Sequence, residues 1–390
     1  MRIGINALYL IPGGVGGTEI YLRSLLEAMA RIAPANEYFL FVNRESAAES
    51  WITASDFHPV VCAVSARNRP RRILWEQFIF PWLLRRYKID VVFNPGFTMP
   101  LLSRSPSVTV FHDLQHRRHP EHFHWFDLPF WNLLLFASAR RSRALIAVSE
   151  ATAHDLDHYY PGVAAKTAVV PHGVDTEFFR IAERRATRGA QRDREKSSAD
   201  KFLLTVSTLH PHKNIGRLLE AFRIFHAGHP RHRLVIAGLK GRAATALAAE
   251  CRNLGLGPFV TFTGWIPRPD LYKLFEDADA FVAPSRFEGF GMPIVEALAA
   301  GIPSACSAIA PLSDIAGPAA VQFDPESVPA IASAMALIAD DVEFRNSASI
   351  EGPRQARLFD WEHSAELTLR QLGDRMVTRS VTDNKAARCQ

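Results

Sequence analysis

The sequence predicts an α/β protein with two doubly wound parallel-sheet domains that face each other across a cleft. Short apolar runs rich in β-branched residues alternate with amphipathic segments, which is typical of parallel sheets with crossover helices. The alternation occurs in two separate series. The chain has 390 residues, enough for two hydrophobic cores.

The expected strands of the first half are Ile3–Leu10, Tyr38–Val42, Val91–Asn94, Val108–Phe111, Ala144–Val148 and Ala168–Val170. Those of the second half are Phe202–Val206, Leu234–Ala237, Val260–Phe262, Ala280–Ala283 and Ser304–Cys306. Helical spacing of apolar residues predicts helices in Ile20–Ile32, Ile215–Phe225 and Ala243–Leu254. Because ligands of parallel sheets bind outside the carboxyl ends of the strands, residues that follow a strand are the candidates for a site.

A change in composition marks the domain boundary. Residues 181–200 are polar and charged, and we expect them to form a linker or an exposed loop. This places an N-terminal domain at 1–179 and a C-terminal domain at 180–359. The polar tail, 377–390, is expected to be frayed.

Composition and charge exclude several classes of protein. The net charge of +5 is too small and too dispersed for a nucleic-acid binder. The four cysteines lack CxxC spacing, so neither a zinc site nor a disulfide framework is expected. No signal peptide or membrane-spanning run is visible. We expect a cytoplasmic protein, with association with the inner face of the membrane as an open alternative.

The segment from Ala280 to Gly301 has the pattern of a phosphate site. It begins as a buried strand, turns through Gly289 and Gly291, and continues as a helix with Pro293 near its start and Gly301 at its end. A glycine turn before a helix offers free N–H groups and the positive end of the helix dipole to an anion. A diphosphate suits this site.

Two carboxylates, Glu288 and Glu296, flank this turn. Carboxylates accept hydrogen bonds from pairs of hydroxyls, such as a ribose diol or the hydroxyls of a sugar ring. Their spacing alone leaves structural roles open. Glu288 suits an exposed loop, and Glu296 suits the positive end of the helix dipole.

This segment resembles the signature EGFGxPxxEAxAxGxP of the family 4 glycosyltransferases, which are retaining enzymes with the GT-B fold. Three further segments match the family in order. Val170–Asp175 resembles VxxNGVD, with His172 in place of Asn, Val148-Ser149-Glu150 resembles the VSE turn, and Phe359-Asp-Trp361 resembles FxW. The last motif implies a helix, 360–376, that packs back on the N-terminal domain.

The resemblance assigns donor contacts in the C-terminal domain. It implies that Glu288 contacts the donor sugar and Glu296 the ribose, with Gly289, Phe290 and Gly291 in the turn between them. Lys213 matches the lysine that neutralises the diphosphate, and Ser207 lies in the same segment. A cation placed there stabilises the charge of the leaving group.

This chain departs from the family before Lys213. Many members carry an arginine there, where this chain has Ser207 and Thr208. His210, His212 or a residue of the other domain is left to supply the second cation.

In the N-terminal domain, two strand ends are candidates. The loop with Gly16 and Gly17 opens a helix but lacks the dinucleotide pattern, and it resembles the family loop that faces the diphosphate and the acceptor. His112 ends a strand, and the resemblance implies a contact with the donor sugar near the reacting carbon. We expect His112 to be needed for chemistry and dispensable for folding, and a core or capping histidine is the alternative. Asp113 either orients His112 or caps the next helix.

No metal or other cofactor is expected. Asp277-Ala-Asp279 looks like a DxD metal motif, but it precedes a buried strand and is expected to be structural. The resemblance implies cations and dipoles around the diphosphate, so catalysis is expected to be independent of metal. It also implies substitution with retention, in which the leaving phosphate oxygen helps to deprotonate the acceptor.

The donor and the acceptor are less defined. The segment Ser207–Asn214 resembles a subgroup with GTLxPRKN, which points to mannose from GDP-mannose and to a glycan or lipid-linked acceptor in polysaccharide or lipopolysaccharide biosynthesis. Arginines and aromatic residues in 67–88 predict either an amphipathic helix on an anionic membrane or a core helix with solvated arginines. A sugar-nucleotide epimerase and a non-catalytic nucleotide-sugar-binding subunit are the alternative functions.

Overall fold

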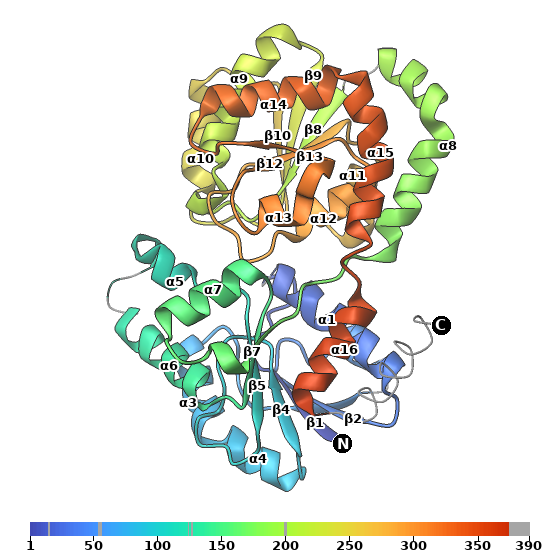
Figure 1. Ribbon diagram of the computed structural model, residues 1–390. Helices are drawn as coiled ribbons and strands as arrows, with labels where there is room; N and C mark the ends of the chain where they lie inside the picture. The colour runs from blue at the N-terminus through green and yellow to red at the C-terminus, as the bar shows by residue number, and fades with distance from the viewer. Residues whose placement is uncertain (15, 54–56, 124, 126–127, 199–200, 374–390) are drawn as a thin grey trace. The chain divides into compact units, whose positions relative to one another are not determined.

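The computed structural model describes residues 1–14, 16–53, 57–123, 125, 128–198 and 201–373. The chain divides into two units (Figure 1). Unit 1 comprises Met1–Gly173 and the segment from Asp360, and unit 2 comprises Val174–Phe359. The division therefore falls at Gly173, a few residues before the boundary expected at Phe179. Residues 377–390, expected to be frayed, lie outside the described part.

The sheet of unit 1 is parallel, with the strand order β3-β2-β1-β4-β5-β6-β7. Its strands are β1 (Arg2–Ala7), β2 (Glu37–Val42), β3 (His58–Val61), β4 (Val91–Asn94), β5 (Ser107–Phe111), β6 (Ala144–Ala147) and β7 (Thr167–Val169). The order reverses between β1 and β4, and this switch point is where doubly wound sheets bind ligands.

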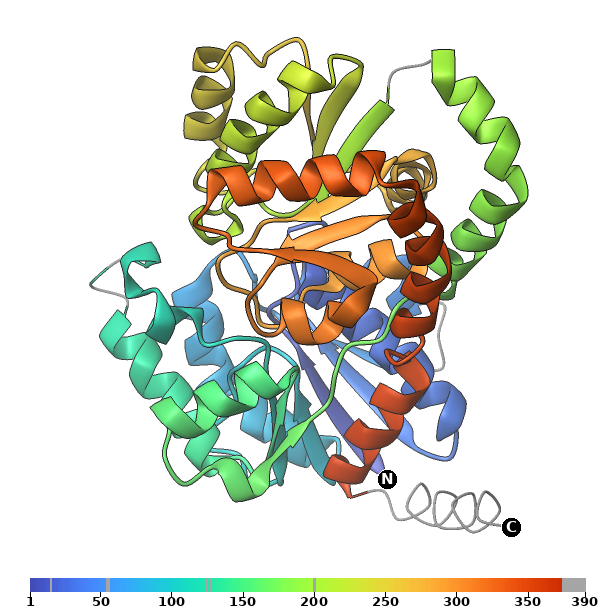
Figure 2. The same cartoon turned by 45° about the horizontal axis from the view of Figure 1, so that its top comes forward.

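The helices of unit 1 lie between these strands, with one from the end of the chain. They are α1 (Gly17–Ile32), α2 (Ser50–Thr53), α3 (Arg69–Phe78), α4 (Phe80–Arg86), α5 (Gln115–Arg118), α6 (Leu128–Arg141), α7 (Glu150–Tyr159) and α16 (Trp361–Leu372), with short 3₁₀ turns at Pro120–His122 and Ala164–Lys166. The returning helix α16 packs beside α1, as both views show (Figures 1 and 2).

The sheet of unit 2 has the same plan, in the order β10-β9-β8-β11-β12-β13. Its strands are β8 (Lys201–Val206), β9 (His232–Ala237), β10 (Val260–Gly264), β11 (Ala280–Ala283), β12 (Ser304–Ser307) and β13 (Ala320–Phe323). All neighbouring pairs are parallel. The switch point lies between β8 and β11.

The helices of unit 2 cover both faces of this sheet. They are α8 (Thr176–Ser198), α9 (Ile215–Gly228), α10 (Ala244–Asn253), α11 (Arg268–Asp277), α12 (Met292–Ala299), α13 (Leu312–Ala316), α14 (Val328–Asp340) and α15 (Val342–Ala356), with 3₁₀ turns at Pro211–Lys213 and Gly317–Ala319. Helix α14 crosses one face, over β11, β12 and β13 (Figure 2).

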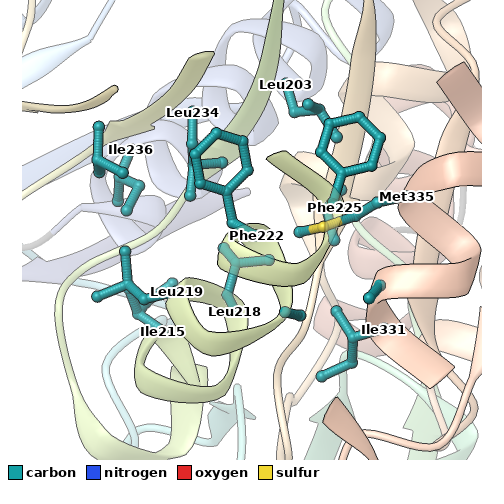
Figure 3. Close-up of a cluster of buried hydrophobic side chains, with 14 of the residues drawn as sticks. Leu203, Ile215, Leu218, Leu219, Phe222, Phe225, Leu234, Ile236, Ile331 and Met335 are labelled. Atoms are coloured by element: carbon teal, nitrogen blue, oxygen red, sulfur yellow. The ribbon is translucent and has the colours of Figure 1, made fainter. Parts of the chain in front are cut away.

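The core of unit 2 forms where two helices meet the strands. Figure 3 shows Phe222 and Phe225 of α9 with Met335 of α14 against the side chains of β8 and β9. Burial of a large apolar side chain contributes about 1.5–3 kcal/mol, so this cluster anchors the strands whose carboxyl ends carry the site.

We expected a linker or an exposed loop at 181–200, and this expectation is wrong for residues 181–198. Residues 199–200 lie outside the described part. The helix α8 continues to Ser198, although its sequence is rich in charge. Its start is buried at Phe178 and Ile181, and Arg185 donates hydrogen bonds to carbonyl oxygens at the end of α11. Tertiary contacts thus support the first part of a helix that composition alone assigned to a linker or loop.

Candidate functional site

A pocket of unit 2 lies at the switch point of its sheet. The chain leaves β8 through Ser207 towards Lys213, and it leaves β11 through Pro284 and Ser285 towards α12. Because β8 and β11 are neighbours, both exits open at the same edge. The pocket lining includes Thr205, Ser207, Lys213, Ser285, Glu288 and Gly291.

Lys213 and Glu288 are brought together in this pocket. The Lys213 Nζ atom and the hydroxyl of Ser285 both donate to Oε1 of Glu288, each at 2.7 Å. The two charged side chains are 18% and 16% exposed, so the ion pair is largely shielded from water. The Ser207 hydroxyl lines the same pocket and makes no hydrogen bond within the described residues. The pocket therefore offers a cation, a carboxylate and a hydroxyl.

The glycine turn has the expected form. Gly291 has φ of +105° and is the N-cap of α12, whose second residue is Pro293. A Cβ atom at Gly291 would lie 2.4 Å from Leu312, so a larger residue does not fit without movement. Gly289 belongs to the same turn, and Phe290 is buried against Phe359. The backbone N–H groups at the start of α12 can face an anion.

Glu296 is buried in an ion pair that the sequence did not reveal. The Nη1 atom of Arg268 donates to Oε1 of Glu296 at 2.9 Å, and the glutamate is 4% exposed. Burial raises the pKa of Glu296, whereas Arg268 opposes this shift. Arg268 also donates to Tyr272 Oη at 3.1 Å, and Tyr272 donates to Asp175. Arg268 lies shortly after β10, which is the signal that could have identified it.

The two histidines considered as a second cation lie together. The rings of His210 and His212 stack at 5.8 Å, and His212 is buried. Arg268 is a further cation in unit 2, and it is paired with Glu296, the residue that the family resemblance assigns to the ribose. Asp279 has a structural contact, since its Oδ2 accepts from the backbone N–H of Phe202 at 2.8 Å.

In unit 1, His112 is buried at the carboxyl end of β5. Its Nε2 atom lies 2.8 Å from the carbonyl oxygen of Pro95, and the Nδ1 atom is buried with no hydrogen-bond partner among the described residues. Burial lowers the pKa of His112 to about 4. The rings of Tyr21 and Phe97 pack against it. Because buried rings pack against His112, we expect its side chain to contribute to folding as well.

Two of the family motifs meet beside His112. The ring of His172 stacks on Trp361 at 6.0 Å and lies 5.6 Å from His112. A Cβ atom at Gly173 would lie 2.3 Å from the backbone nitrogen of Trp361. The glycine is therefore required where α16 returns to unit 1.

The glycine-rich loop precedes α1 as expected. Gly16 is the N-cap with φ of +57°, and Gly17 is the first residue of the helix. Glu19 accepts from the backbone N–H of Gly13 at 3.1 Å, and burial raises its pKa. Asp113 accepts from the backbone N–H of Gln115, the first residue of α5, at 2.9 Å, while Leu114 is the N-cap. His112, Gly16 and Gly17 thus belong to unit 1, and the other predicted site residues belong to unit 2.

Family models match most of the chain. Residues 15–178 match the model described as Glycosyltransferase Family 4, and residues 188–355 match the model described as Glycosyl transferases group 1. Between them they cover the main part of both units and leave out α16.

Among curated relatives, the chain is 27% identical to O-antigen chain mannosyltransferase B of Escherichia coli, over 74% of this chain and 75% of the relative. It is 25% identical to O-antigen chain mannosyltransferase RfbU of Salmonella typhimurium, over 68% of this chain and 71% of the relative. It is also 30% identical to D-inositol 3-phosphate glycosyltransferase of Kribbella flavida, over 62% of this chain and 58% of the relative.

Solved structures support the same fold. Sucrose-phosphate synthase from Thermosynechococcus elongatus superposes with a TM-score of 0.78 at 19% identity, covering 97% of this chain and 100% of that one. Anabaena HepE, in complex with UDP and glucose, superposes with a TM-score of 0.73 at 18% identity, covering 96% of this chain and 99% of that one. With two parallel-sheet units and both family models matched in order, the chain belongs to the family 4 glycosyltransferases and has their GT-B fold.

Proposed function

We propose that this glycosyltransferase transfers mannose from GDP-mannose, with retention, to a glycan or lipid-linked acceptor during the synthesis of an O-antigen-type polysaccharide. The two O-antigen mannosyltransferases support this proposal, since each matches more than two thirds of both chains. The resemblance of Ser207–Asn214 to the mannosyltransferase subgroup points the same way.

The ion pair of Lys213 and Glu288 is the observation that carries the proposal. In the reaction, the bond between C1 of the sugar and the diphosphate oxygen breaks, and a bond between C1 and the acceptor oxygen forms on the same face. The acceptor proton passes to the leaving phosphate oxygen. Lys213 and the N–H groups of α12 stabilise the charge on the leaving diphosphate, and Glu288 accepts from sugar hydroxyls.

Catalysis is proposed to need no metal, because Lys213 and the helix N-terminus supply the positive field that a divalent ion would otherwise provide. Activity should therefore survive EDTA. A strict requirement for Mn²⁺ or Mg²⁺ would show that the charge on the diphosphate is neutralised in another way.

A panel of nucleotide sugars tests the donor. A ligand at 100 times its dissociation constant adds about 2.7 kcal/mol to the free energy of unfolding, which is measurable as a shift in melting temperature. GDP-mannose should give a larger shift than UDP-glucose, UDP-galactose and GDP-fucose. A larger shift with a uridine nucleotide would refute the assignment of both sugar and base.

We propose that the protein meets its acceptor at the cytoplasmic face of the membrane. None of the described helices is long and apolar enough to cross a bilayer. An apolar face is exposed along α3 and α4. It comprises Leu74 and Phe78 of α3, Ile79 between the helices and Trp82 of α4, and it is followed by Arg85 and Arg86. Amphipathic surfaces with basic residues bind anionic lipid.

Co-sedimentation with vesicles that contain phosphatidylglycerol tests this membrane face. The double variant Phe78→Ser/Trp82→Ser should bind less than the wild type, whereas Ile350→Ser, an equally exposed position on α15, should bind as well as the wild type. Equal sedimentation of all three proteins would exclude this face as the contact.

A further inference from the structure

Unit 1 contains a buried arginine, Arg72, with one N–H group that has no hydrogen-bond partner among the described residues. Arg72 lies in the first turn of α3 and is 8% exposed. Its Nε atom is fully buried and has no hydrogen-bond partner among the described residues. Buried polar groups are almost always hydrogen-bonded, and an exception of this kind calls for an explanation such as an absent ligand.

The groups around Arg72 come from both sides of the switch point between β1 and β4. Tyr9 follows β1, and its ring packs against Gly96, where a Cβ atom would lie 2.6 Å from the ring. Thr98 follows β4 and donates to Oε1 of Glu76 at 2.9 Å. We call Tyr9, Arg72, Glu76 and Thr98 the Arg72 cluster.

Two hydrogen-bond donors of the cluster have no acceptor among the described residues. The hydroxyl of Tyr9 is buried and, like the Nε atom of Arg72, has no partner among the described residues. Glu76 acts on Arg72 through its charge, but the hydrogen bonds to its carboxylate come from Thr98 and Asn6. A guanidinium N–H and a phenolic O–H therefore stand unsatisfied at the edge of the sheet where ligands collect.

An oxyanion fits these groups. Charge-assisted hydrogen bonds to a phosphate or carboxylate would satisfy both Arg72 and Tyr9, and arginine is well suited to such groups. Glu76 partly offsets the charge of Arg72, so the site suits one anionic group and a neighbouring hydroxyl better than a highly charged ligand. This cluster belongs to unit 1, whereas the ion pair of Lys213 and Glu288 belongs to unit 2.

We infer that the Arg72 cluster binds a phosphate or carboxylate group of the acceptor. The inference rests on the proposed function, because an acceptor presupposes transfer. It identifies the acceptor chemically as an anion, such as a sugar phosphate, a lipid-linked phosphate or an acidic sugar.

Titration calorimetry with phenyl phosphate, benzoate and benzyl alcohol tests this inference, with GDP present at saturation to occupy the nucleotide site. Wild type should bind one of the two anions and not the alcohol, and which anion binds separates phosphate from carboxylate. Arg72→Gln should weaken binding at least ten-fold, and Tyr9→Phe, which removes only the hydroxyl, should weaken it several-fold. Arg71→Gln, an exposed neighbour on the same helix, should bind as wild type does.

Three results would overturn the inference. The first is that neither anion binds the wild type. The second is that Arg72→Gln and Tyr9→Phe both bind the anion as tightly as the wild type does. The third is that Arg72→Gln weakens the binding of GDP as strongly as it weakens the binding of the anion. The last result would assign Arg72 to the diphosphate of the donor. If Arg72→Gln does not fold, Tyr9→Phe alone decides. Anion binding is measured without turnover, and if GDP does not bind, the nucleotide that does bind takes its place. The result is therefore independent of whether GDP-mannose proves to be the donor.

Discussion

Burial fixes the protonation state of His112. With a pKa of about 4 the ring is neutral at neutral pH, and one ring nitrogen then carries the proton. The contact between Nε2 and the carbonyl oxygen of Pro95 places that proton on Nε2, because a carbonyl only accepts. The lone pair of Nδ1 is therefore an acceptor, which is suited to a sugar hydroxyl.

We expect His112→Ala to lower both stability and activity. Loss of the ring leaves a cavity among Tyr21 and Phe97, which should lower the free energy of unfolding by about 2–4 kcal/mol. Loss of the acceptor should lower kcat by about 10²-fold per folded molecule. Urea unfolding and turnover measured on the folded fraction check the two effects. Full activity per folded molecule would leave His112 a purely structural role.

Glu296 and Arg268 show why the choice of substitution matters. Glu296→Ala would leave a partly buried guanidinium without its carboxylate, so a loss of nucleotide binding would be hard to separate from a loss of structure. Glu296→Gln keeps the shape of the side chain and removes the charge.

In Glu296→Gln, GDP binding should weaken by about 1.5–3 kcal/mol, because a ribose diol loses a charged acceptor. Calorimetry with GDP gives the value, and Glu362→Gln, at an exposed position on α16, is the control. Unchanged affinity would show that Glu296 serves Arg268 alone.

At the scale of secondary structure, all interior strands and the edge strands β7 and β10 were predicted, whereas the edge strands β3 and β13 were not. The interior strands are mostly buried and most carry several consecutive apolar residues, as is typical of buried parallel strands. Strand β3 contains Pro59 and is mostly exposed, and β13 places Gln322 in solvent. Edge strands need less apolar sequence and tolerate proline, so both escaped notice.

The return of α16 depends on a glycine. Gly173→Ala places a methyl group 2.3 Å from the backbone of Trp361, which cannot move as a side chain can. Overpacking of this kind costs about 1–3 kcal/mol. Urea unfolding should show this loss, whereas Gly257→Ala, which meets no atom within 4 Å, should be nearly neutral. Equal stability of the two variants would mean that the contact with Trp361 relaxes freely.

At the scale of the whole molecule, the two units repeat one plan. Each sheet reverses its order at a switch point, and polar side chains gather there in both units. The motif around Glu288 and the lysine at 213 could be found from sequence, because a glycine turn and the family pattern mark them. Arg72 could not, since its importance lies in burial and in groups of other elements. For Arg268 the sequence shows only its place after β10, and its ion pair with Glu296 appears only in the structure.

The stability of unit 1 should depend on pH through His116. Burial lowers its pKa to about 4, so the stability that it contributes is present above the unfolded value of 6.5 and is lost as pH falls towards 4. The difference in unfolding free energy between wild type and His116→Gln should therefore shrink by about 2–3 kcal/mol between pH 7.5 and pH 4.5. His154→Gln, exposed on α7, should show no such change. A constant difference for His116→Gln would contradict this account.

Donor turnover with and without Lys213 tests the central claim most directly. Release of GDP from GDP-mannose is measured in the absence of acceptor, where a transferase hydrolyses its donor slowly and an inert binder does not. Wild type and Lys273→Ala, an exposed control on α11, should release GDP at equal rates. Lys213→Met should release it about 10²-fold more slowly, with a smaller change in GDP-mannose affinity. Equal rates for Lys213→Met and wild type, or no release by any of the three, would contradict the account.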